Sequence, residues 1–91
     1  MIMNIQLYLN IKYNESSFKI LKLLDGNNIE FSVLTFRDDD LDKVSSLIGE
    51  KVRKLPQVIV DGKRIGGYYD LMEFLMNMKL INYKGVKNDI D

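Results

Sequence analysis

The stretch KYNESSFKIL, residues 12–21, lies where an expected first strand ends and an expected first helix begins. Small α/β proteins commonly place ligands and reactive groups at such a junction. This one supplies a Lys, a Tyr, an Asn, a Glu and two Ser side chains near its start. The sequence contains no histidine and no cysteine, which excludes Ser-His-Asp and Cys-His catalysis, thiolate chemistry, disulfides and iron–sulfur ligation by this chain. Carboxylates, amines, guanidinium groups and hydroxyls remain.

A run of aspartates offers carboxylate oxygens of the kind that bind hard cations. The run lacks the glycine and the terminal glutamate that a calcium-binding EF-hand loop requires. Negative charge is also favoured at the start of a helix, and apolar residues follow at helical spacing from Leu41 to Ile48. We therefore interpret the run as a solvated helix N-terminus and expect no metal site. Its members are Asp38, Asp39, Asp40 and Asp42.

Composition and charge indicate one folded domain without a strongly charged surface. The chain has 91 residues, of which 46% are hydrophobic and 29% charged, so it can bury a core. Thirteen basic and thirteen acidic residues cancel, which argues against sequence-independent binding of nucleic acid. No stretch reaches the roughly 20 apolar residues of a membrane span, and the start MIMNIQLYLN lacks signal-peptide features. We expect a cytoplasmic protein without nucleic-acid or membrane partners.

Hydrophobic periodicity predicts the element order β-α-β-α-β-β-α. The Asp61-Gly62 pair predicts a tight hairpin between the last two strands. A right-handed β-α-β crossover makes the first two strands parallel. The sequence thus predicts an α/β protein with a thioredoxin-like three-layer sandwich and a four-stranded mixed sheet. Strands are expected at 3–9, 29–34, 57–61 and 63–65, and helices from Asn14 or Ser16 to Gly26, at 41–48 and at 71–78.

A series of short motifs occupies residues 53–75. They are Leu55-Pro56-Gln57, Asp61-Gly62, Ile65-Gly66-Gly67 and Asp70-Leu71. In this order and spacing they resemble the second half of a glutaredoxin, which typically reads Thr-Val-Pro-Gln, an apolar strand, Asp-Gly, Ile-Gly-Gly and Asp-Leu. The layout of the first half agrees, so we expect a glutaredoxin-like domain at residues 1–80, followed by a polar tail at 81–91.

The resemblance places the Cys-x-x-Cys motif of glutaredoxins on Asn14-Glu15-Ser16-Ser17. The nucleophilic cysteine of the family corresponds to Asn14, and the resolving cysteine corresponds to Ser17. Asn cannot ionise, and a Ser hydroxyl needs a general base, for which this sequence has no histidine. No thiol–disulfide exchange is therefore expected from this sequence.

The resemblance also implies a groove for glutathione, centred on Leu55 and Pro56. In glutaredoxins the proline is cis, and the preceding residue offers its backbone to the cysteinyl unit of glutathione. Leu55 would take that role here, for glutathione or for an extended peptide. Lys12 and Arg53 are candidate partners for the glycyl carboxylate, Arg53 by its match to a basic family position and Lys12 by its place near the loop.

The other end of glutathione, the γ-glutamyl group, docks in glutaredoxins at the start of the last helix. The corresponding residues here are Gly67 and Tyr68. Tyr69 stands where the family usually has an Asp or Ser that takes the ligand's ammonium group, and Tyr cannot supply that charge. Asp70 matches the family's Asp, or it simply caps the helix. Half of the family's site is therefore expected to remain.

Three hypotheses of function remain open. The first is a redox-inactive binding module, with no cofactor of its own, for glutathione as a weak ligand or for an extended segment of a partner protein. The second is a glutathione-dependent oxidoreductase of cell redox homeostasis, an electron donor to protein disulfides such as those of ribonucleotide reductase, whose cysteines are absent from this version of the sequence. Asn14 with Ser17 does not fit paired Cys-to-Ser replacement. The third is a structural or assembly protein; the oligomeric state is open.

Overall fold

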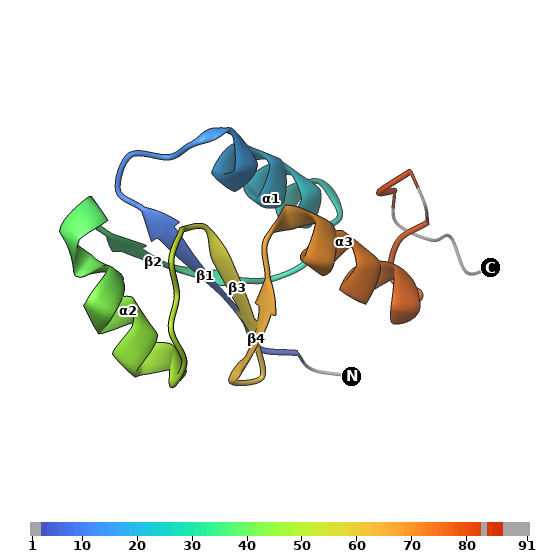
Figure 1. Cartoon of the computed structure of the whole chain (residues 1–91). Coiled ribbons are helices and arrows are strands. Elements are labelled where there is room, and N and C mark those ends of the chain that lie inside the picture. Colours follow the sequence, from blue (N-terminus) through green and yellow to red (C-terminus); the bar gives the residue numbers. More distant parts are fainter. Residues whose placement is uncertain (1–2, 83, 87–91) are drawn as a thin grey trace.

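The element order of the chain agrees with the expected order, with one additional short helix. The computed structural model describes residues 3–82 and 84–86. Figure 1 shows the sheet between two helical layers. The elements are β1 (Ile5–Asn10), α1 (Glu15–Gly26), β2 (Ser32–Phe36), the 3-10 helix η1 (Asp38–Asp40), α2 (Leu41–Ile48), β3 (Gln57–Val60), β4 (Lys63–Gly66) and α3 (Tyr68–Asn77).

The four strands form one mixed sheet in the order β2-β1-β3-β4. β1 and β2 are parallel, whereas β1 pairs with β3, and β3 with β4, in antiparallel fashion. The hairpin between β3 and β4 turns at Asp61 and Gly62, whose φ angles of 51° and 83° are both positive, as the expected two-residue turn requires. This arrangement confirms the predicted α/β, thioredoxin-like fold class.

Two hydrophobic clusters join the helices to opposite faces of the sheet. The larger cluster joins β1 and β3 to α1 and α3, and it includes Leu7, Leu24 and Leu71, each 0% exposed. The smaller cluster joins the other face to α2 through Tyr8 and Val44. In Figure 1 α1 and α3 accordingly lie on one side of the sheet and α2 on the other. Both clusters are anchored on β1 because its side chains alternate between the two faces.

The second strand begins later than expected. Local composition favoured residues 29–34, but the structure forms β2 from Ser32 to Phe36. The reason is the parallel pairing with β1, in which Gln6 lies opposite Ser32 and Asn10 opposite Phe36. The turn after α1 uses the preceding residues: Asn28 has a φ angle of 57°.

The chain beyond α3 also packs on the domain. Ile81 is 2% exposed and belongs to the larger cluster. The side chain of Asn27 donates a hydrogen bond to the Gly85 carbonyl at 3.0 Å. Packing therefore continues past residue 80, where we expected the polar tail to begin; residues 87–91 of that tail lie outside the described residues. Among the helices of the described ranges, none has the length and hydropathy of a bilayer span.

Candidate functional site

Asn14 caps the first turn of α1. Its backbone is extended, with φ of −93° and ψ of 179°, and its side-chain Oδ1 accepts from the backbone N–H of Ser17 at 2.9 Å. The same oxygen accepts from the Ser17 hydroxyl, also at 2.9 Å. Ser17 is 0% exposed. Asn is among the best N-cap residues because its oxygen satisfies an otherwise unpaired helix N–H. The two positions that the resemblance matched to the glutaredoxin cysteines thus bond to each other.

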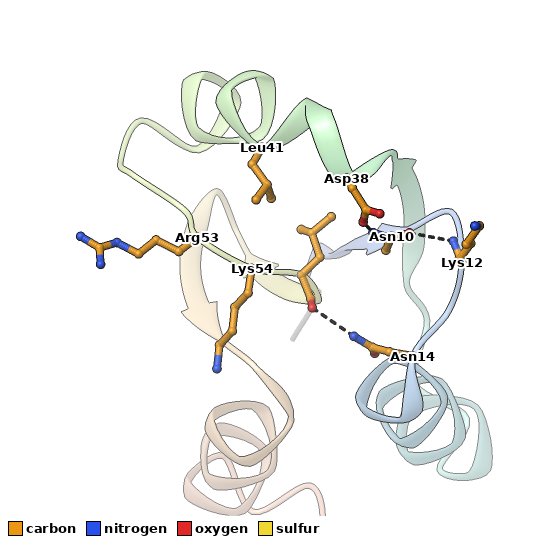
Figure 2. Close-up of a pocket in the computed structure, with 8 residues that line it drawn as sticks. Asn10, Lys12, Asn14, Asp38, Leu41, Arg53 and Lys54 are labelled. Atoms are coloured by element: carbon orange, nitrogen blue, oxygen red, sulfur yellow. Dashed lines mark hydrogen bonds between the residues drawn. The ribbon is translucent and has the colours of Figure 1, made fainter.

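The other end of the Asn14 carboxamide faces away from its own helix. Its Nδ2 donates to the backbone carbonyl of Leu55 at 3.2 Å. Figure 2 shows this hydrogen bond crossing from the start of α1 to the segment before β3. One side chain therefore connects two parts of the chain that are 41 positions apart in sequence.

The segment before β3 is held by a further carboxamide. The peptide bond between Leu55 and Pro56 is cis. Gln57, which is 4% exposed, donates from Nε2 to the Lys54 carbonyl at 3.1 Å. Its Oε1 accepts from Arg64 Nη1 at 3.3 Å. Because both ends of the Gln57 amide are bonded, its orientation is determined by its neighbours.

The start of α3 is capped from within the helix. The Asp70 carboxylate accepts from the backbone N–H of Gly67 at 3.1 Å. Gly66 has a φ angle of 128°, and a Cβ added there would lie 2.4 Å from Asp70 Oδ2. Gly66 therefore meets two requirements, a backbone conformation that favours glycine and space for the carboxylate. Of the two expected roles for Asp70, helix capping is the one that these contacts display.

Two adjacent tyrosines continue this helix start. The rings of Tyr68 and Tyr69 meet edge to face with centroids 5.2 Å apart. Lys19 of α1 places its Nζ 5.8 Å from the centroid of the Tyr68 ring, a distance at which a cation and an aromatic face attract. Tyr69 is 76% exposed. The two tyrosine rings thus pack against each other, and the Tyr69 side chain faces solvent.

Two hollows meet at the hydrogen bond between Asn14 and Leu55. We call the first, of about 430 Å³, the α2-side hollow and the second, of about 440 Å³, the α3-side hollow. Both include Asn14, Lys54 and Leu55 in their lining. Several residues expected at the site line these hollows. The α2-side hollow brings together Lys12, Asn14, Arg53 and Leu55. The α3-side hollow brings together Asn14, Leu55, Pro56, Gly67, Tyr68, Tyr69 and Asp70. Ser17 lies below them, buried against Asn14.

The α2-side hollow is electropositive. In the part of the chain that the structure describes, Lys12, Arg53 and Lys54 form no ion pair. Its carboxylate, on Asp38, accepts a hydrogen bond from Asn10 Nδ2. In Figure 2 Lys12 and Arg53 lie on opposite sides of Asn14 and Lys54, and their side chains point away from each other. Such a surface attracts anions.

Several residues of the two hollows were not expected from the sequence. Asn10 and Asp38 meet at the carboxyl end of β1, and Gln57 and Arg64 support the segment before β3. The sequence feature that could have identified Gln57 is its position directly after a proline and at the start of an apolar strand. No comparable feature marked Arg64. No group of carboxylates within residues 3–82 and 84–86 is arranged to hold a metal ion.

Comparisons with known proteins identify the fold. No protein-family model matches the sequence, and no curated protein matches it. Among solved structures, glutaredoxin 1 from Francisella tularensis, complexed with cacodylate, is 19% identical, with a TM-score of 0.67 over 85% of this chain and 95% of that one. The buckwheat glutaredoxin–glutathione complex is 25% identical, with a TM-score of 0.63 over 84% of this chain and 71% of that one.

A second group of similar structures consists of glutathione S-transferases. The enzyme of Ceriporiopsis subvermispora, in complex with glutathione, is 18% identical, with a TM-score of 0.69 over 81% of this chain. This chain spans 36% of that larger protein. The chain therefore has the thioredoxin-like fold of glutaredoxins and glutathione S-transferases, and it has this fold without any cysteine.

Proposed function

We propose that this chain is a redox-inactive binding protein of the cytoplasm. Its groove, which the α2-side and α3-side hollows form together, takes glutathione as a weak ligand or an extended segment of a partner protein. The observation that carries the proposal is the convergence of two hollows on the Leu55 backbone, each lined by the residues expected for a ligand. The buckwheat glutaredoxin and the Ceriporiopsis transferase are complexes with glutathione, which supports the choice of probe.

Each half of the groove suits one end of such a ligand. Lys12 and Arg53 in the α2-side hollow would attract a carboxylate. At the α3 side, an added Cβ at Gly67 would meet nothing within 4 Å, which leaves space at this helix start for the γ-glutamyl carboxylate. Tyr69 offers the ligand's ammonium group no charge, and Asp70 already caps α3. Because the ligand's ammonium group would form no ion pair, we expect glutathione to bind weakly.

Redox inactivity follows from the composition and from the position of Asn14. A chain without cysteine cannot form the mixed disulfide through which thiol–disulfide exchange proceeds. Asn14 also makes three hydrogen bonds, two to Ser17 and one to Leu55. This integration into its surroundings weighs against the alternative hypothesis of an oxidoreductase of cell redox homeostasis whose cysteines were replaced.

An assembly role is the second candidate, and one observation favours it. Ile11, Tyr13 and Phe18, on the loop after β1 and the first turn of α1, are 57%, 39% and 59% exposed. The rings of Tyr13 and Phe18 meet edge to face at 5.7 Å. Exposed aromatic side chains are enriched where proteins bind one another. Dimerisation without any response to glutathione would favour this role.

An NMR amide-shift titration with reduced glutathione, into the millimolar range, tests the proposal. We expect saturable shifts near Lys12, Leu55 and residues 67–70. Replacing both cations, Lys12→Ala with Arg53→Ala, should weaken binding, because the carboxylate loses its partners. Lys43→Ala, an exposed lysine of α2 that lines neither hollow, is the matched control and should leave it unchanged. An absence of saturable shifts in the wild type would overturn the proposal for glutathione.

A further inference from the structure

Two backbone carbonyl groups of the segment before β3 accept hydrogen bonds from carboxamide side chains. Asn14 Nδ2 donates to the Leu55 carbonyl at 3.2 Å, and Gln57 Nε2 donates to the Lys54 carbonyl at 3.1 Å. Both carboxamides are held at their other ends, Asn14 by Ser17 and Gln57 by Arg64. These acceptors are therefore satisfied within the protein.

The donors of the same segment remain open. Among the residues that the structure describes, the backbone N–H groups of Lys54 and Leu55 donate to no protein acceptor. Asn14 uses both lone pairs of Oδ1 on Ser17 and one of its two amide hydrogens on Leu55. The segment before β3 thus has two backbone N–H groups without a protein acceptor and two carbonyl groups that already accept a hydrogen bond. It lies beside three cations without ion pairs.

This one-sided arrangement decides which ligand chemistry fits. An extended peptide backbone pairs by giving a hydrogen bond and receiving one. At Leu55 it finds a free donor, but the carbonyl already accepts one hydrogen bond, from Asn14, and has only one lone pair left. A carboxylate brings acceptors only, so it loses nothing when the carbonyl is occupied, and the nearby cations favour it further.

We propose that Asn14 is the specificity-determining residue of this groove: by occupying the Leu55 carbonyl, it selects anionic groups that bring acceptors only over ligands that pair in a strand-like manner. The inference rests on the proposed function, since it concerns the same groove, and of the two ligands proposed there it favours glutathione, which carries two carboxylates, over an extended segment of a partner protein. It assigns Asn14 a positive role at the position where glutaredoxins carry their nucleophile. The residue competes with the ligand for the Leu55 carbonyl and so weakens a backbone hydrogen bond that the groove would otherwise form.

The substitution Asn14→Ser isolates this role. Ser is as good an N-cap residue as Asn, but its hydroxyl is too short to span the gap to Leu55 that the longer Asn side chain bridges at 3.2 Å. The carbonyl of Leu55 would then be open while the start of α1 stays capped. Asn14→Gly is a second variant for the same purpose, since Gly is also tolerated at the N-cap position. The ¹³C shift of the Leu55 carbonyl reports loss of the bond in either variant.

The experiment compares two probes on the wild type and on Asn14→Ser by NMR titration. Reduced glutathione has a peptide backbone and can use both groups of Leu55, whereas glutarate is a dicarboxylate with acceptors only. We expect the variant to bind glutathione about threefold to tenfold more tightly, the effect of one added hydrogen bond. The affinity for glutarate should stay within about twofold, because glutarate cannot use the opened carbonyl.

The outcomes separate this inference from the proposed function. If the wild type binds glutathione and the variant binds it equally or more weakly, the inference is overturned and the proposed function stands. If only the variant binds glutathione while the wild type binds glutarate, the inference stands and the native groove is not a glutathione site. If the variant gains affinity for glutarate as much as for glutathione, or if neither protein binds either probe, the inference is overturned.

Discussion

The N-termini of α1 and α3 face the same groove, and they are capped in different ways. At α1 the capping residue itself carries the side chain, and Asn14 satisfies both its own helix and the Leu55 carbonyl. At α3 the capping residue is Gly67, and the carboxylate reaches back from Asp70, three positions later. The first arrangement places a side chain between the helix and the groove. The second leaves space beside Gly67, where an added Cβ would meet nothing within 4 Å, while the Gly67 N–H itself is bonded to Asp70.

The difference shows how a fold can keep one half of a site and close the other. Both helix termini carry the partial positive charge that favours anions and thiolates. At α1 that charge faces a neutral carboxamide whose oxygen accepts two hydrogen bonds from Ser17, so it activates nothing. At α3 the same charge faces Asp70 and open space.

Replacing the carboxamide with a thiol should have the largest effect. In Asn14→Cys the helix terminus would lower the thiol pKa, and the thiolate would attack one sulfur of glutathione disulfide. A new S–S bond forms, the old one breaks, and glutathione leaves as its thiolate. Mass spectrometry should detect this adduct, which the wild type cannot form because it has no cysteine.

The matched control for that variant is Ser17→Cys. Ser17 lies in the same helix turn but is 0% exposed. The thiol of Ser17→Cys should therefore react at least about tenfold more slowly than the thiol of Asn14→Cys. Equal rates for the two variants would contradict the view that position 14 faces the groove and position 17 lies beneath it.

Substitution at Gly66 tests the close approach at the start of α3. Gly66→Ala should lower the free energy of unfolding by about 1–3 kcal/mol, because alanine disfavours positive φ angles and its Cβ would meet the Asp70 carboxylate. Gly26→Ala is the control, since that Cβ would meet nothing within 4 Å. Its stability should be unchanged or raised by up to about 1 kcal/mol. Urea unfolding measures both, and a similar loss in the two variants would argue against the contact.

Removing each cap in turn compares the two termini directly. Asn14→Ala should lower the free energy of unfolding by about 1–2 kcal/mol, because it deletes three hydrogen bonds at a part-buried site. Asp70→Ala should cost about 0.5–1 kcal/mol, since its hydrogen bond to Gly67 is exposed. Thermal or urea unfolding gives both values. An equal or larger loss for Asp70→Ala would show that the tether to Leu55 adds little.

Much of the fold was predictable because its signals are local. The Asp61-Gly62 pair predicted a hairpin, and both residues have positive φ angles in the structure. The periodicity of the last helix predicted a buried face, and Leu71 and Leu75 are 0% exposed. The start of β2 was not predictable in this way, because Ser32 joins the sheet through its register opposite Gln6 of β1.

The candidate site divides along the same line. The motifs around Pro56 and Gly67 predicted residues that the fold brings together, since both line the α3-side hollow. The sequence pattern also placed Asn14 at a helix start, as a cap or as the counterpart of a lost cysteine. Nothing in the pattern connected Asn14 to the Leu55 carbonyl, which is 41 positions away.

The amino-acid composition alone excludes thiol and imidazole chemistry for this chain, because the side chains on which these reactions depend are absent from it. The sequence also determined the periodicities and turns from which the layers are built. The tertiary structure decided which backbone groups of the groove stay available. That choice depends on two atoms approaching within 3.2 Å, and only the packing of the β1–α1 junction against the segment before β3 brings them together.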